Sequence, residues 1–219
     1  MGCGVREAII DSGVNPNHPH VGGVAGGAGI GPGGECDLYL DFLGHGTAVA
    51  GAIREKAPDA LLYAVKVFDR TLTTSVDTLL QALEWSIRQE MHVVNLSLGT
   101  IKQEGRERFE QVMARAAQAG LVVVAAREAS GRPILPGSLP SSIGVGLDWN
   151  CPRDAYRYAD GTFFASGYPR SIPGVPAERN LNGISFAVAN MTGFVARARE
   201  LCEAQGLRQV LLDNVPASE

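Results

Sequence analysis

The hydrophobic positions of this chain fall into two alternating kinds of segment. Five short runs are almost continuously apolar and rich in β-branched residues, which is typical of parallel strands covered on both faces. These runs predict strands over Glu7–Asp11, Leu61–Val67, His92–Ser97, Leu121–Ala126 and Ser142–Leu147.

Two of the segments between these runs carry apolar residues at helical spacing. Ser75, a residue type that caps helices, precedes the first segment, and Gly120 is placed to end the second. The apolar stripes consist of Val76, Leu79, Leu80, Leu83 and Ile87, and of Phe109, Val112, Met113, Ala116 and Ala117. Alternation of strand and helix predicts an α/β protein of three layers, with a mostly parallel central sheet flanked by helices.

Two segments have the composition of surface loops. Residues Gly22–Gly34 hold eight glycines, and Pro169–Pro176 hold three prolines. Because the strand pattern continues across both, we expect one domain over residues 1–219. Residues 29–34 match the spacing G-x-G-x-x-G, but they lead into the strand-like segment 37–40 instead of a helix, so a dinucleotide site is not predicted.

Composition narrows the classes of function. The 219 residues carry a formal net charge of −4 with scattered basic residues, unlike a nucleic-acid-binding surface. No apolar run reaches the ~20 residues that cross a bilayer, and no signal peptide is visible. We therefore expect a cytoplasmic protein without membrane or nucleic-acid partners. The four cysteines are widely spaced, and no calcium-loop pattern is present, so we expect reduced thiols and neither a metal nor another cofactor. These cysteines are Cys3, Cys36, Cys151 and Cys202.

Three short stretches carry candidate chemistry. Asp11 ends an apolar strand, His45 lies between two glycines at the start of a small-residue segment, and Ser185 follows Gly183 at the start of another. Serine becomes a nucleophile when an imidazole takes its proton, and a carboxylate fixes the tautomer of that imidazole. A serine at a helix N-terminus also places backbone N–H groups near a developing oxyanion.

Each of these residues has an ordinary structural explanation when it is taken alone. An aspartate at a strand end usually forms a turn, a lone histidine is usually structural, and a serine before a helix is usually an N-cap. The combination in the chain order Asp, His, Ser is more specific, and it predicts a catalytic triad of Asp11, His45 and Ser185.

With these motifs the sequence resembles the subtilisin-like serine protease family over nearly its whole length. The stretches that carry the resemblance are Asp11–Val14, Gly44–Gly51, Asn95–Gly99, Val122–Ala126 and Gly183–Ala187. The resemblance implies a seven-stranded, mainly parallel sheet and an endopeptidase that acts on a peptide or protein substrate. It also implies two walls of a substrate cleft, Ser97, Leu98 and Gly99 on one side and Ala125, Ala126, Arg127 and Glu128 on the other, with Asn182 as a further substrate contact.

The chain departs from this family at the oxyanion site. Ala129 stands where the family has an asparagine donor, and Ile184 stands where it commonly has threonine. Three explanations remain open. The enzyme is slow and serves one substrate, another donor such as Arg127 or Asn150 replaces the asparagine, or the chain is a pseudoprotease that binds peptides. Arg127 and Glu128 either form a surface salt bridge or add charge to the specificity pocket.

Because only ten residues precede Asp11, we expect a domain without the prosegment of secreted relatives. A slow, narrow protease fits that constraint, and the chain resembles the leader peptidases that accompany peptide-modifying enzymes. A leader-bearing precursor, like that of the quinohemoprotein amine dehydrogenase small subunit, is thus a candidate substrate. A peptide-binding scaffold, and an esterase or transpeptidase with the same triad, are the competing hypotheses.

Overall fold

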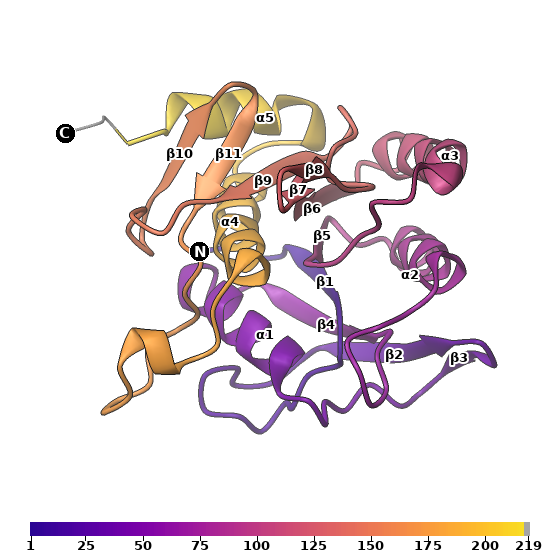
Figure 1. Cartoon of the computed structure of the whole chain (residues 1–219), viewed down its shortest axis with the longest axis horizontal. Helices are drawn as coiled ribbons and strands as arrows, with labels where there is room; N and C mark the ends of the chain where they lie inside the picture. The colour runs from indigo at the N-terminus through magenta and orange to yellow at the C-terminus, as the bar shows by residue number, and fades with distance from the viewer. Residues whose placement is uncertain (217–219) are drawn as a thin grey trace.

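The centre of the molecule is one twisted sheet of nine strands, seen in a computed structural model that describes residues 1–216 (Figure 1). The strand order is β10-β11-β9-β6-β5-β1-β4-β2-β3, and the seven strands from β11 to β2 run parallel. One antiparallel strand, β10 or β3, borders each end. The strands are β1 (Arg6–Asp11), β2 (Gly26–Gly31), β3 (Gly34–Cys36), β4 (Leu61–Lys66), β5 (Val93–Leu96), β6 (Val122–Ala126), β9 (Ile143–Leu147), β10 (Tyr156–Ala159) and β11 (Thr162–Ala165).

Helices cover both faces of the sheet, which confirms the predicted three-layer α/β fold. The helices are α1 (His45–Lys56), α2 (Val76–Arg88), α3 (Arg106–Gln118), α4 (Ile184–Arg199) and α5 (Ala204–Asp213). One core cluster joins the sheet to α1, α4 and α5, and a second joins it to α2 and α3. A separate two-stranded ribbon, β7 (Glu128–Ala129) with β8 (Arg132–Pro133), follows β6.

All five predicted strands and both predicted helices are present, with ends within three residues of the prediction. The N-cap is also confirmed, because the Ser75 hydroxyl accepts a hydrogen bond of 3.0 Å from the Thr78 N–H. Gly120 adopts a φ of 71° after α3, the left-handed conformation that ends helices. The proline-rich segment 169–176 has no helix or strand, as predicted.

The prediction of a surface loop over Gly22–Gly34 is wrong for most of that segment. Residues 26–31 form β2, which pairs parallel with β4, and Gly34 begins β3. A Cβ at Gly27 would lie 2.2 Å from the Ala64 carbonyl oxygen, and one at Gly29 would lie 2.5 Å from the Leu38 oxygen. The glycines therefore allow close packing of backbone. Segment 37–40, read as strand-like, is irregular because no strand pairs with it.

Glu7 is an unusual component of the core. It lies on β1 two residues before Ile9, so both side chains face the α1 and α4 side of the sheet. Glu7 is fully buried, and neither carboxylate oxygen has a hydrogen-bond partner within residues 1–216. Burial raises the pKa of Glu7 well above its ordinary value, although the charge of Arg54 opposes the rise.

We predict that Glu7→Met stabilises the protein, with a gain that grows with pH. The pKa of Glu7 is higher in the folded than in the unfolded chain, so protonated Glu7 is compatible with burial at low pH. The free energy of unfolding of the wild type therefore decreases as the pH rises above about 4, where Glu7 ionises in the unfolded chain. Urea unfolding should show a gain of about 1–3 kcal/mol at pH 8 and a smaller one at pH 4.5. The exposed Glu178→Met is the control, and a gain independent of pH would contradict the prediction.

Candidate active site

Asp11 and His45 are in direct contact at the carboxyl end of the sheet. Asp11 is the last residue of β1 and His45 is the first residue of α1. The His45 Nδ1 lies 2.7 Å from the Asp11 Oδ1, an oxygen that also accepts a 2.7 Å hydrogen bond from the Ser12 N–H. Asp11 is fully buried and His45 is partly exposed, so the carboxylate orients a ring whose other edge remains accessible.

Gly46 explains why a glycine follows the histidine. A Cβ at this position would lie 2.1 Å from the Gly13 carbonyl oxygen and 3.2 Å from the Asp11 carboxylate. A side chain there would push the first turn of α1 away from β1. The glycine thus permits the backbone approach that brings His45 to Asp11.

Asp41 holds the start of α1, and sequence reasoning missed this role. Its Oδ1 accepts hydrogen bonds of 2.9 Å from the N–H groups of Leu43 and Gly44 and from the Ser12 hydroxyl. Its Oδ2 accepts from the Thr47 N–H at 2.9 Å and from the Thr47 hydroxyl at 2.6 Å. The bond from the Leu43 N–H to the Asp41 side chain forms an Asx-turn. Aspartate is a residue type that favours such turns, and this preference was the available sequence signal.

The charged groups around His45 raise the pKa of its imidazole. Burial of the ring lowers its pKa, but the hydrogen bond and charge of Asp11, aided by the charge of Asp41, outweigh that effect. The pKa of His45 therefore stands above its ordinary value of 6.5. For Asp41 itself, burial raises the pKa, yet the hydrogen bonds from Thr47, Leu43 and Gly44 bring it below the usual range.

Ser185 lies in the first turn of α4, next to both elements. Helix α4 packs against α1, and the ring of Phe186 lies 5.7 Å from that of His45, centroid to centroid. The Ser97 hydroxyl donates a 3.3 Å hydrogen bond to the Ser185 carbonyl oxygen, which fixes Ser185 beside the end of β5. Within the described chain, no hydrogen bond joins His45 to Ser185. The three predicted residues thus lie at the same edge of the sheet. Asp11 and His45 are hydrogen-bonded, whereas His45 and Ser185 are not.

A buried polar chain supports Ser97 from behind. The Asn95 side-chain amide donates to the Ser97 hydroxyl at 3.0 Å, and the Thr192 hydroxyl donates to the Asn95 oxygen at 3.0 Å. Asn95 and Thr192 are both fully buried. Sequence reasoning singled out neither for this role, although an asparagine inside an otherwise apolar strand is a signal that a specific partner exists.

The two predicted walls of the cleft stand side by side, because β5 pairs with β6. Ile134 links them, since its N–H donates to the Arg127 carbonyl at 3.0 Å and its Cδ1 lies 3.6 Å from the position of a Cβ on Gly99. The neighbouring Leu135 exchanges backbone hydrogen bonds of 3.0 and 2.9 Å with Thr100. Ile134 is buried, and it lies against both walls.

The structure assigns no substrate-binding partner to the remaining predicted contacts among the described residues. Ala129 is exposed in the β7–β8 ribbon. No side-chain hydrogen bond of Arg127 or Asn150 appears in the part of the chain that the structure describes, so neither is assigned as the replacement donor. Arg127 and Glu128 form no ion pair with any described residue, which leaves the salt-bridge explanation without support. Asn182 is exposed, and its amide donates to the Asn180 carbonyl at 3.2 Å.

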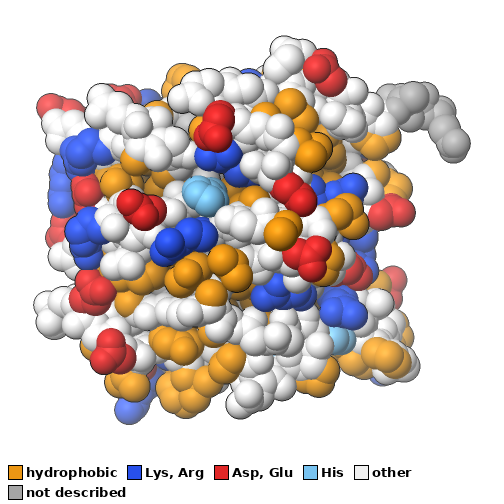
Figure 2. All heavy atoms as spheres, turned by 180° about the vertical axis from the view of Figure 1, so that it is seen from behind, with side chains coloured by type: hydrophobic (Ala, Val, Ile, Leu, Met, Phe, Trp, Pro, Cys, Tyr) orange, Lys and Arg blue, Asp and Glu red, His pale blue; other side chains and the backbone are white. Residues whose placement is uncertain are grey.

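On the face shown in Figure 2, Lys and Arg side chains are interspersed with Asp and Glu. Over residues 1–216, no cluster of His, Cys, Asp and Glu is arranged to hold a metal ion, and no helix is long and apolar enough to cross a membrane. All four cysteines are free thiols.

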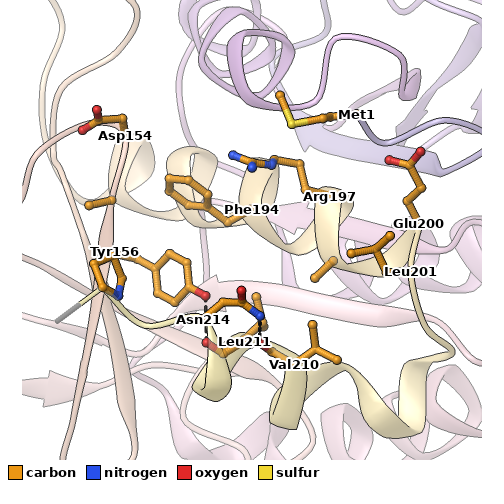
Figure 3. Close-up of a pocket in the computed structure, with 13 residues that line it drawn as sticks. Met1, Asp154, Tyr156, Phe194, Arg197, Glu200, Leu201, Val210, Leu211 and Asn214 are labelled. Carbon is orange, nitrogen blue, oxygen red and sulfur yellow. Dashed lines mark hydrogen bonds between the residues drawn. The ribbon is translucent and has the colours of Figure 1, made fainter.

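A separate cavity of ≈ 500 Å³ lies at the opposite end of α4 (Figure 3). Phe194, Arg197 and Tyr156 line it, and the Tyr156 hydroxyl donates a 2.7 Å hydrogen bond to the Leu211 carbonyl. Twelve residues of helix separate Ser185 from Arg197, a distance of about 18 Å along the axis. This cavity therefore belongs to the packing of α5 and takes no part in the chemistry of Asp11 and His45.

Comparisons with known proteins agree with this fold. The model of the peptidase S8, or subtilase, family matches residues 2–145, a range that includes Asp11 and His45. The chain belongs to the subtilase family.

Individual relatives extend the similarity to most of the chain. Subtilisin E from Bacillus subtilis (strain 168) is 33% identical over 208 residues, which cover 87% of this chain and 52% of the relative. Subtilisin Savinase from Lederbergia lenta is 34% identical over 219 residues, covering 91% and 77%. This chain thus spans about half the length of Subtilisin E. The structure of the prenylagaramide maturation protease PagA has the same fold, with a TM-score of 0.75, 23% identity, and coverage of 98% of this chain and 85% of that one.

We predict that Asp41→Asn shifts the pH dependence of the site to lower pH. Removal of a negative charge near the imidazolium lowers the pKa of His45, so the neutral base appears at a lower pH. The labelling rate of Ser185 by a fluorophosphonate, followed from pH 5 to 9, should have its midpoint lowered by up to about one pH unit. The exposed Asp37→Asn is the control, and an unshifted midpoint in Asp41→Asn would refute the coupling.

Proposed function

We propose that this protein is a serine endopeptidase whose catalytic triad is Asp11, His45 and Ser185. The observation that carries the proposal is the 2.7 Å contact of a buried carboxylate with a partly exposed imidazole, beside the helix turn that bears Ser185. Family membership supports the same reaction class.

In the proposed reaction the Ser185 Oγ attacks the scissile carbonyl carbon while the His45 Nε2 takes the hydroxyl proton. Asp11 keeps the Nδ1–H oriented and stabilises the imidazolium. The carbonyl oxygen becomes an oxyanion beside the free N–H groups at the start of α4. His45 then protonates the leaving amine, the C–N bond breaks, and water hydrolyses the acyl-enzyme by the same steps.

We further propose slow turnover on a dedicated peptide substrate. Ala129 and Ile184 supply no side-chain donor to the oxyanion, and loss of one such donor costs about 10² to 10³ in turnover. A low rate suits an enzyme that processes one precursor. The described maturation role of PagA, a structural neighbour, supports leader removal as the class of reaction.

A peptide-binding pseudoprotease is the second candidate. The open contact between His45 and Ser185, together with the missing donor at Ala129, favours it. In that case the cleft would hold an extended peptide along Ser97–Gly99 without cleaving it.

A fluorophosphonate probe separates these two functions. Labelling should occur at Ser185, be abolished in Ser185→Ala, and fall by at least about 10²-fold in His45→Ala, because the serine loses its base. Intact-mass and peptide-mapping mass spectrometry would locate the adduct. A folded protein that remains unlabelled would rule out the triad and leave the peptide-binding function.

A second prediction concerns the residue that supplies the scissile carbonyl. Ile134 lies against both walls, and we propose that its side chain narrows the pocket between them, so the protein should prefer glycine, alanine or serine at that position. Ile134→Gly should raise kcat/KM for leucine or phenylalanine there by tenfold or more, since the pocket gains the volume of a side chain. Peptide-library profiling measures this preference, with the exposed Ile101→Gly as control, and an unchanged profile would contradict the assignment.

A further inference from the structure

A second hollow adjoins the candidate active site on the side of α1. It has a volume of ≈ 480 Å³ and is lined by Leu43, Gly44 and Ala48 around His45 and by Leu181, four residues before Ser185. Loop residues that follow β1 and β11 complete the lining, among them His18, His20 and Arg170. The hollow is therefore bordered by the residues that flank His45 in the chain, while His45 and Ser185 are not part of its lining.

The hollow contains one acidic and one strongly basic side chain, Asp41 and Arg170. Asp41 keeps its negative charge, but both of its carboxylate oxygens already accept the hydrogen bonds described above. The half-buried Arg170 makes one long hydrogen bond, 3.4 Å from Nη1 to the His20 carbonyl oxygen, and forms no ion pair with a described residue. Four of the five guanidinium N–H donors are thus open to a ligand.

Two further titratable groups bear on the charge around Arg170. Burial and the charges of Arg170 and His18 lower the pKa of His20, which is consistent with a cationic environment. Glu55, the acidic group that opposes this shift, is hydrogen-bonded to Lys56 and Arg153. The Asn180 amide donates a 3.3 Å hydrogen bond to the carbonyl oxygen of Arg170, which holds the backbone at this position.

The position of the general acid decides which part of a substrate enters this hollow. If the acyl side of the peptide lies along Ser97–Gly99, the leaving amine must face His45, because that ring protonates it. The chain beyond the scissile bond then continues past Leu43 and Gly44 into the hollow. Its occupant is the leaving portion of the substrate.

We propose that Arg170 selects substrates with an aspartate or glutamate within the first few residues after the scissile bond. This inference rests on the proposed function, since it assigns the leaving side of the same cleft. A carboxylate pairs with a planar guanidinium through two parallel hydrogen bonds, and Phe42 and Leu181 offer apolar contact to the flanking side chains.

The test uses a proteome-derived peptide library digested with the full chain and with Arg170→Gln. Mass spectrometry of the new N-termini should show acidic residues enriched on the leaving side for the wild type only. For a matched pair of peptides with Glu or Gln at the enriched position, kcat/KM should differ about tenfold in the wild type and by less than twofold in Arg170→Gln. Arg106→Gln, an exposed substitution on α3, should keep the wild-type preference.

A binding measurement keeps the inference testable if no peptide is cleaved. Immobilised Ser185→Ala and Ser185→Ala/Arg170→Gln are incubated with the same library, and bound peptides are eluted and identified. Arg170-dependent retention of acidic peptides without cleavage would support the inference while the endopeptidase function fails. Cleavage or binding without acidic enrichment, or enrichment that survives Arg170→Gln, would overturn it.

Discussion

The site depends on one close approach, that of the first turn of α1 to the end of β1. The carbonyl of Gly13 lies where a side chain at Gly46 would stand, so only a glycine lets the helix begin there. This approach brings the His45 imidazole within 2.7 Å of a fully buried carboxylate. Burial strengthens the electrostatic attraction between the carboxylate and the imidazolium, because the effective dielectric constant is lower away from water. The raised pKa of His45 is the direct consequence.

Asp41 supplies the restraint that keeps this approach in place. Its five hydrogen bonds connect the loop before α1, the first turn of α1 and the turn after β1. The Thr47 hydroxyl extends the connection by accepting a 3.0 Å hydrogen bond from the Asn15 N–H. One carboxylate therefore positions two of the proposed catalytic residues and also contributes charge to the imidazole. Such coupling of structure and electrostatics is what a preorganised site requires.

The proposed nucleophile, Ser185, is held by a second set of contacts. The chain from Thr192 through Asn95 to Ser97 runs from the interior of α4 to the end of β5 and returns to the Ser185 carbonyl. The proposed acid–base and nucleophilic groups thus rest on separate supports that meet at one edge of the sheet. This arrangement fits a site that closes on a bound peptide.

The sequence by itself determined the five central strands, the two amphipathic helices and the identity of the candidate triad, because these depend on local hydrophobic periodicity and on short motifs. It misassigned segment 22–34, whose glycines allow close strand pairing. A glycine required for close approach to a distant backbone cannot be distinguished by sequence from a glycine in a flexible loop. The sequence also could not identify Asp41, Thr192, Ile134 or Arg170. Their roles arise from partners that are distant in the chain or lie in irregular loops, and no periodicity records such contacts. Only the tertiary structure decided which polar groups are satisfied, which are buried and which remain free to bind.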